Sequence, residues 1–104
     1  MTIAQWLGTR QPAAPPALAR RIAELTAALD PTRLDAAAQC LLAAERALPV
    51  LISADDDSRR SALDLLAIDA LVTYAFEAAS SQPERIPELA ASAMVQLSSL
   101  ARPA

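Results

Sequence analysis

One stretch of sequence decides the fold of this 104-residue chain: residues 55–80, which read DDDSRRSALDLLAIDALVTYAFEAAS. It contains no proline and no glycine, and at about 100° per residue its apolar side chains cover nearly the whole circumference of a helix. One face of that helix carries Leu63, Ala67, Leu71, Tyr74 and Ala78. Most of the rest carries Leu65, Ile68, Val72 and Phe76. Such a helix must be covered on two sides, so we predict a central helix whose second side is an interface for a partner.

The amino-acid composition indicates an all-α fold. Alanine and leucine, both strong helix formers, occupy 26 and 16 positions, whereas there is one glycine and almost no run of β-branched residues. A chain of this length forms one domain. We therefore expect residues 1–104 to form a single helical domain, with a bundle of four main helices over residues 17–102 and a short N-terminal helix.

The N-terminal segment combines a helix signal with a connector. Thr2 is followed three positions later by Gln5, which predicts a capping box for a helix within residues 1–8. Gly8 is placed to end that helix in the left-handed conformation. Three prolines within residues 9–16 predict an extended connector, because proline fixes φ and keeps the preceding residue out of a helix.

Apolar spacings of three and four predict three further helices. The first carries Leu18, Ile22, Leu25 and Leu29. The second is expected to begin with Asp30 as its N-cap and Pro31 in its first turn, and Pro49 should kink or end it. Its main side carries Leu34, Ala38, Leu41, Glu45 and Leu48. Pro83 and Pro87 bracket the start of the last helix, which carries Ile86, Ala90, Ala93, Leu97 and Leu100.

Missing residue types exclude many functions. The chain has no His and no Lys, which removes imidazole relays, imidazole metal ligands, Schiff bases and the lysine of phosphate-binding loops. With one glycine, no dinucleotide-binding or phosphate-binding glycine motif can be written. We therefore predict no catalytic residue, no cofactor and no metal site.

The charge balance argues against nucleic acid and membrane partners. Nine arginines stand against twelve acids, a net charge of −3, so the positive field that binds phosphate backbones is missing. The longest uncharged stretch, residues 89–101, is shorter than the roughly 20 residues of a membrane span.

The start of the chain lacks a signal-peptide pattern and Cys40 is the single cysteine, so we expect a cytoplasmic protein. The use of arginine alone with abundant alanine resembles the composition of a GC-rich bacterial genome.

Polar side chains within the central helix are candidates for burial. These are Asp64, Asp69 and Tyr74. The two aspartates are five positions apart and project about 140° from one another, so they cannot form a paired acid and base on one face. A buried carboxylate would need an arginine, the one cation type in the chain. Asp69 also belongs to a polar strip that is either a solvent edge or a seam across an interface, with Thr73, Glu77 and Ser80.

The acidic run of residues 55–57 has two interpretations. Followed by Arg59, Arg60 and the 69–77 segment, it resembles the aspartate-rich region of trans-isoprenyl diphosphate synthases, which holds Mg²⁺ against a diphosphate. That family's D-D-x-x-D pattern would need an acid at Arg59, and no second aspartate-rich motif exists in the chain. We therefore interpret the run as acids favoured by the positive end of a helix dipole, and leave weak cation association open.

Two further side chains, Cys40 and Trp6, each have two interpretations. Cys40 is expected to be a small buried core residue, with a reactive thiol as the alternative. Trp6, the one tryptophan, lies on a helix too short to be stable alone. Its ring should therefore anchor that helix, either on its own bundle or on a second chain.

We predict a small non-enzymatic interaction protein that self-associates as a homodimer, or binds another helical protein, through its central helix over residues 63–79. The predicted interface residues are Trp6, Leu65, Ile68, Val72 and Phe76. The alternative is a carrier or sensor that holds a small apolar ligand in an alanine-lined bundle. The least favoured prediction is an enzyme that uses Asp64, Asp69, Tyr74 or Glu77.

Overall fold

A computed structural model describes residues 2–29, 35–54 and 58–101 and confirms the all-α prediction. Within these residues there is no strand, and four longer helices follow a short N-terminal one. The elements are α1 (Ile3–Leu7), α2 (Pro16–Thr26), α3 (Ala36–Ser53), α4 (Arg59–Ala79), the 3-10 turn η1 (Pro83–Arg85) and α5 (Ile86–Ala101).

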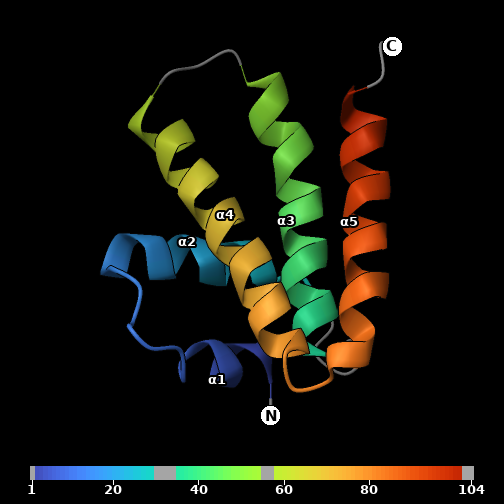
Figure 1. The fold of residues 1–104 in the computed structure, drawn as a ribbon. Coiled ribbons are helices and arrows are strands. Elements are labelled where there is room, and N and C mark those ends of the chain that lie inside the picture. Colours follow the sequence, from blue (N-terminus) through green and yellow to red (C-terminus); the bar gives the residue numbers. More distant parts are fainter. Residues whose placement is uncertain (1, 30–34, 55–57, 102–104) are drawn as a thin grey trace.

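Helices α3 and α4 form the most extensive pair, and the other helices attach to it (Figure 1). Helix α5 runs beside α3 and makes few contacts with α4. Helix α2 crosses the pair and packs on both of its members, while α1 lies near the beginning of α3. Helix α3 is long and apolar enough to cross a membrane by length and composition, a property that core helices of folded bundles share.

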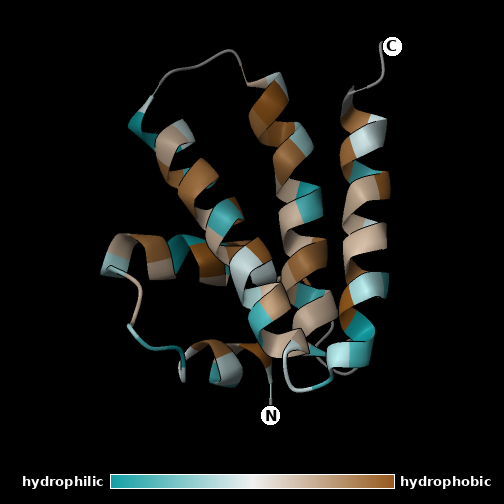
Figure 2. Cartoon of the chain, in the orientation of Figure 1, coloured by the Kyte–Doolittle hydropathy of each residue, from teal (hydrophilic) through white to brown (hydrophobic). Residues whose placement is uncertain are grey.

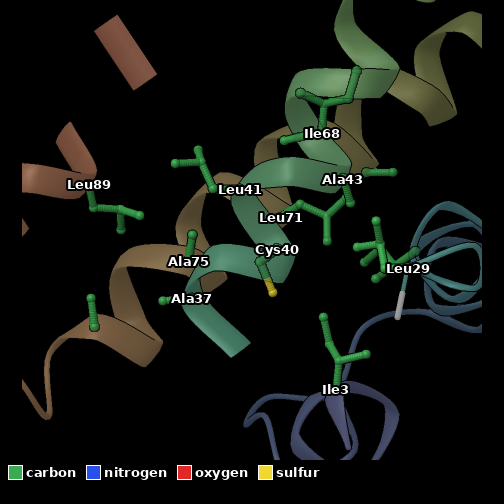
Figure 3. Packing of buried hydrophobic residues seen from close by; sticks show 14 residues of the cluster. Ile3, Leu29, Ala37, Cys40, Leu41, Ala43, Ile68, Leu71, Ala75 and Leu89 are labelled. Carbon is green, nitrogen blue, oxygen red and sulfur yellow. The ribbon is translucent and has the colours of Figure 1, made fainter. Parts of the chain in front are cut away.

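The core lies where α2 meets the α3–α4 pair. Leu71 and Cys40 are completely buried there, and small side chains around them such as Ala67 and Ala75 let the two helices approach closely. Figure 3 shows Leu89 of α5 and Ile3 of α1 reaching this pair from different sides. The complete set of buried apolar residues is Ile3, Ile22, Leu29, Ala37, Cys40, Leu41, Ala43, Ala44, Ala67, Ile68, Leu71, Ala75, Ala79 and Leu89.

The predicted capping box of α1 is confirmed, but its ending differs from the prediction. The Thr2 Oγ1 atom accepts from the Gln5 backbone N–H at 3.1 Å, and the Gln5 Oε1 atom accepts from the Thr2 N–H at 2.8 Å. Gly8 has φ −64°, which is right-handed rather than left-handed. The chain leaves α1 through further right-handed turns, with the Thr9 N–H bonded to the Trp6 carbonyl at 3.0 Å, so no positive φ is required.

Helix α3 begins later than predicted and passes through its proline. Its N-cap is Asp35, whose Oδ1 atom accepts from the Ala38 N–H at 2.9 Å, so the prediction of Asp30 as the cap is wrong. Residues 30–34 lie outside the described part of the chain. The helix continues beyond Pro49 to Ser53, and Leu48 and Leu51 on either side of the proline pack against the core.

Helix α4 has almost the predicted bounds. Ser58 caps it, with its Oγ atom accepting from the Ser61 N–H at 3.2 Å, and Ser80 follows its last turn. The acidic run before it, residues 55–57, lies outside the described part, so neither interpretation of that run is tested. The predicted entry into α5 is confirmed, with Pro83 opening η1 and Pro87 in the first turn of the helix.

Candidate functional site

A groove between α4 and α5, floored by α3, is the candidate interaction site. It encloses about 90 Å³ and is almost entirely apolar. Ile68 and Val72 line it from α4, and Leu97 and Leu100 line it from α5, with Leu48 below. Two of the predicted interface residues therefore lie in one groove, and they face a helix that makes few contacts with their own.

Exposed apolar side chains border this groove. Leu97 is 50% exposed and Met94, one turn before it on α5, is 62% exposed. Leu65, on α4, is 57% exposed and lies seven residues before Val72, which places both on one side of the helix. Figure 2 shows hydrophobic colouring continuing along α3, α4 and α5 toward the end of the bundle away from α1.

Of the predicted interface residues on α4, only some have surface that a partner could contact. Leu65 is exposed, Val72 and Phe76 are half-buried, and Ile68 is buried in the core of its own chain. Ile68 supports the floor of the groove and has little surface to offer. The α5 contribution, Met94 and Leu97, was not among the predicted interface residues. The signal for it was the uncharged stretch that begins at residue 89.

Trp6 lies apart from this groove and anchors α1 on its own chain. Its ring meets the ring of Tyr74 edge-on, with centroids 6.2 Å apart and planes at 82°. The Arg10 guanidinium stacks over the same indole at 3.9 Å from the centroid. Of the two anchoring alternatives, the ring therefore docks on its own bundle. Tyr74 is half-buried in this contact.

Glu45 is the functional candidate that sequence reasoning missed. It lines the groove from α3, and its Oε1 atom is buried without a hydrogen-bond partner in the described residues. Burial raises the pKa of this carboxyl above its ordinary value. The signal was its position on the same side of the helix as Leu41 and Leu48, where a carboxylate has to face apolar neighbours.

The two aspartates of α4 have different surroundings. Asp64 is half-buried and paired with Arg21 of α2, whose Nε atom donates to Oδ1 at 2.6 Å. This contact raises the pKa of the Arg21 guanidinium. Asp69 is exposed, so the prediction of burial is wrong for that residue. The reason is that, within the residues that the structure describes, no neighbouring helix packs over its side of α4.

The polar strip on α4 is exposed in the single chain. Asp69, Thr73, Glu77 and Ser80 are all exposed. The Thr73 hydroxyl donates to the Asp69 carbonyl at 3.0 Å, and the Ser80 hydroxyl donates to the Glu77 carbonyl at 2.6 Å. The Glu77 carboxylate accepts from Arg10 at 2.9 Å. These side chains contact their own chain or solvent. Among the described residues, no group of three or more His, Cys, Asp and Glu could hold a metal ion.

Cys40 has the environment of a structural thiol. Its side chain is completely buried between α3 and its neighbours. Burial raises the pKa of the thiol to about 12, against a smaller lowering by the positive charge of Arg10. The thiol is therefore protonated at neutral pH, which favours the core interpretation over the reactive one.

Comparison of the chain with known protein families, with curated proteins and with solved structures gave no match. The residues and their geometry therefore carry the functional inference.

Proposed function

We propose that this chain is a small non-enzymatic interaction protein that forms a homodimer, in which the α4–α5 groove and its borders pack against the same surface of a second copy. The observation that carries the proposal is a group of exposed apolar side chains at an incompletely filled groove. Leu97 lines the groove, and Leu65 and Met94 each lie one helical turn before a lining residue, Ile68 and Leu97 respectively. Burying such side chains against a partner removes apolar surface from water, which is the main favourable term in association.

The charge distribution favours a second copy over a charged partner. From residue 89 to residue 100, α5 carries no charged side chain. In a two-fold symmetric dimer the same surface faces itself, so a charge near the axis would meet a like charge. The uncharged surface of α5 avoids this repulsion, and it offers no ion pair to a charged partner.

The surroundings of the candidate catalytic groups support a non-enzymatic role. Asp64 is held by Arg21, Cys40 is a buried neutral thiol, and Asp69 lies on an exposed edge. General acid–base or nucleophilic chemistry needs such groups within hydrogen-bond reach of one another and of a substrate.

The test places an arginine at neighbouring positions of α5 and measures sedimentation velocity at tens of micromolar protein. Leu97→Arg puts a charge into the interface and should leave a monomer. Ser98→Arg is the matched control, because Ser98 is exposed and projects about 100° away from Leu97, and it should leave the dimer intact. Leu65→Arg on α4 should also give a monomer. The proposal is overturned if the unmodified chain is monomeric, or if Leu97→Arg and Leu65→Arg both stay dimeric with unchanged helix content.

A further inference from the structure

A second cavity lies between α1, the connector and α2, away from the α4–α5 groove. It has a volume of about 620 Å³, within the range of small-molecule sites in proteins. Six of the fifteen described residues that line it are alanines, and Ile3, Leu7, Ile22 and Leu29 supply larger apolar walls. The space exists because alanines along α2 and the connector leave the gap beside α1 unfilled.

Few polar groups line this cavity. Two of them already make hydrogen bonds within the fold: the Thr2 hydroxyl caps α1, and the Thr26 hydroxyl donates to the Ile22 carbonyl at 3.0 Å. Tyr74 contributes a phenol. Among the described lining residues Arg10 is the one that carries a charge, and the carboxylate that pairs with it, Glu77, is not one of the lining residues.

The Arg10 guanidinium is held in place with donor capacity left over. It stacks over Trp6, its Nη1 atom donates to Glu77 at 2.9 Å and its Nη2 atom donates to Thr9 at 2.9 Å. Its buried Nε atom has no acceptor in the described residues. A guanidinium carries five N–H donors in a planar fork that matches a carboxylate. Because Nε is buried, the second N–H groups of Nη1 and Nη2 are the donors left for another anion.

We propose that this cavity binds an aliphatic carboxylate, with its hydrocarbon chain against the alanine, isoleucine and leucine walls and its carboxylate on Arg10. The walls favour an aliphatic chain because Tyr74 is the one aromatic residue among them. Within the described part of the chain the lining holds one cation, Arg10, and no acid, which favours an anionic head. Glu77 occupies part of the guanidinium and is the internal competitor of the ligand. This site is independent of self-association.

The chain contains its own reporter for the first test. Trp6 is the one tryptophan and touches the guanidinium, so ligand binding should change its fluorescence. Dodecanoate, titrated below its micelle concentration, should give a saturable change, and dodecanol should bind about tenfold more weakly because it lacks the charge-assisted bonds. Equal affinities, or no saturable change with dodecanoate, would overturn the proposal.

Two substitutions, each with a matched control and followed by titration calorimetry, locate the site. Glu77→Gln frees the guanidinium and should tighten dodecanoate binding without affecting dodecanol, whereas Glu84→Gln on the exposed η1 turn should change neither. Ala23→Leu fills the cavity and should weaken both ligands, and Ala91→Leu on the exposed side of α5 is its control. Unchanged binding in both Glu77→Gln and Ala23→Leu contradicts the assignment. None of these variants removes Arg10, so the outcome does not depend on keeping its stack with Trp6.

Discussion

Arg21 of α2 and Asp64 of α4 are joined by two hydrogen bonds, from Nε to Oδ1 at 2.6 Å and from Nη2 to Oδ2 at 3.4 Å. The planar guanidinium and the carboxylate therefore meet in a two-point geometry. Both side chains are about one-fifth exposed, and Glu24 accepts a further bond from the same guanidinium at 2.9 Å. The pair fixes α2 across the α3–α4 pair, which holds the wall of the second cavity in place.

Removing this pair should loosen the attachment of α2. We expect Asp64→Asn to lower the free energy of unfolding by about 1 kcal/mol, the size of a well-oriented, partly exposed ion pair. A double-mutant cycle with Arg21→Gln should give a coupling energy of the same order in urea unfolding, and high salt should reduce it. Arg20→Gln, at the exposed neighbouring position, is the control and should change stability little. A coupling energy near zero would show that the two side chains act independently.

Two leucines of α4 should differ sharply on truncation. Leu71 is completely buried, whereas Leu66 is 57% exposed. Leu71→Ala should cost about 2–5 kcal/mol, because it removes apolar contacts and leaves a cavity. Leu66→Ala should stay within about 0.5 kcal/mol of the unmodified chain. Chemical denaturation of the two variants tests the location of the core, and similar losses at both sites would argue against it.

The stability of the chain should depend on pH through Glu45. Burial raises the pKa of its native carboxyl above the ordinary value of 4.5, so the native state prefers the protonated form. The resulting penalty is absent below pH 4.5, and stability falls as the pH rises through the native pKa. Glu45→Gln should therefore be more stable than the unmodified chain at pH 7, and the difference should vanish near pH 4. Other carboxyls are common to both chains, so a difference that does not change with pH would contradict this assignment.

The thiol of Cys40 should be unreactive in the native state. Its pKa of about 12 and its complete burial leave almost no thiolate at pH 8 and no path for a reagent. A colorimetric disulfide reagent should label it only as fast as the chain unfolds, and fully in guanidinium chloride. Rapid labelling of the folded protein would mean that α3 opens far more easily than its packing indicates.

Local signals in the sequence predicted most of the helices. Thr2 with Gln5 marks the beginning of α1, and Ser58 lies at the cap of α4, because a capping side chain acts within three residues of itself. Capping preference alone does not distinguish Asp30 from Asp35 as the start of α3. Both are good capping residues, and the choice between them depends on distant contacts. Asp35 also accepts a hydrogen bond from Arg85, a partner fifty residues away.

The candidate sites were less predictable, because they depend on which helices become neighbours. Asp64 and Asp69 are similar by sequence, yet α2 supplies an arginine to the first, and no described residue covers the second. The exposure of Met94 follows from the few contacts between α4 and α5, whereas the burial of Ile68 follows from the extensive packing of α4 on α3. The periodicity of the sequence predicts which side chains share one face of a helix. Which other helix packs against that face depends on the arrangement of the whole bundle.

Native mass spectrometry of the unmodified protein, purified gently, tests the central claim most directly, since one spectrum reports both the number of subunits and any retained ligand. We predict a dominant species at twice 10.9 kDa, alone or with the added mass of bound ligand. A spectrum in which the dominant species is a single chain of 10.9 kDa over a range of micromolar concentrations would contradict self-association through the α4–α5 groove.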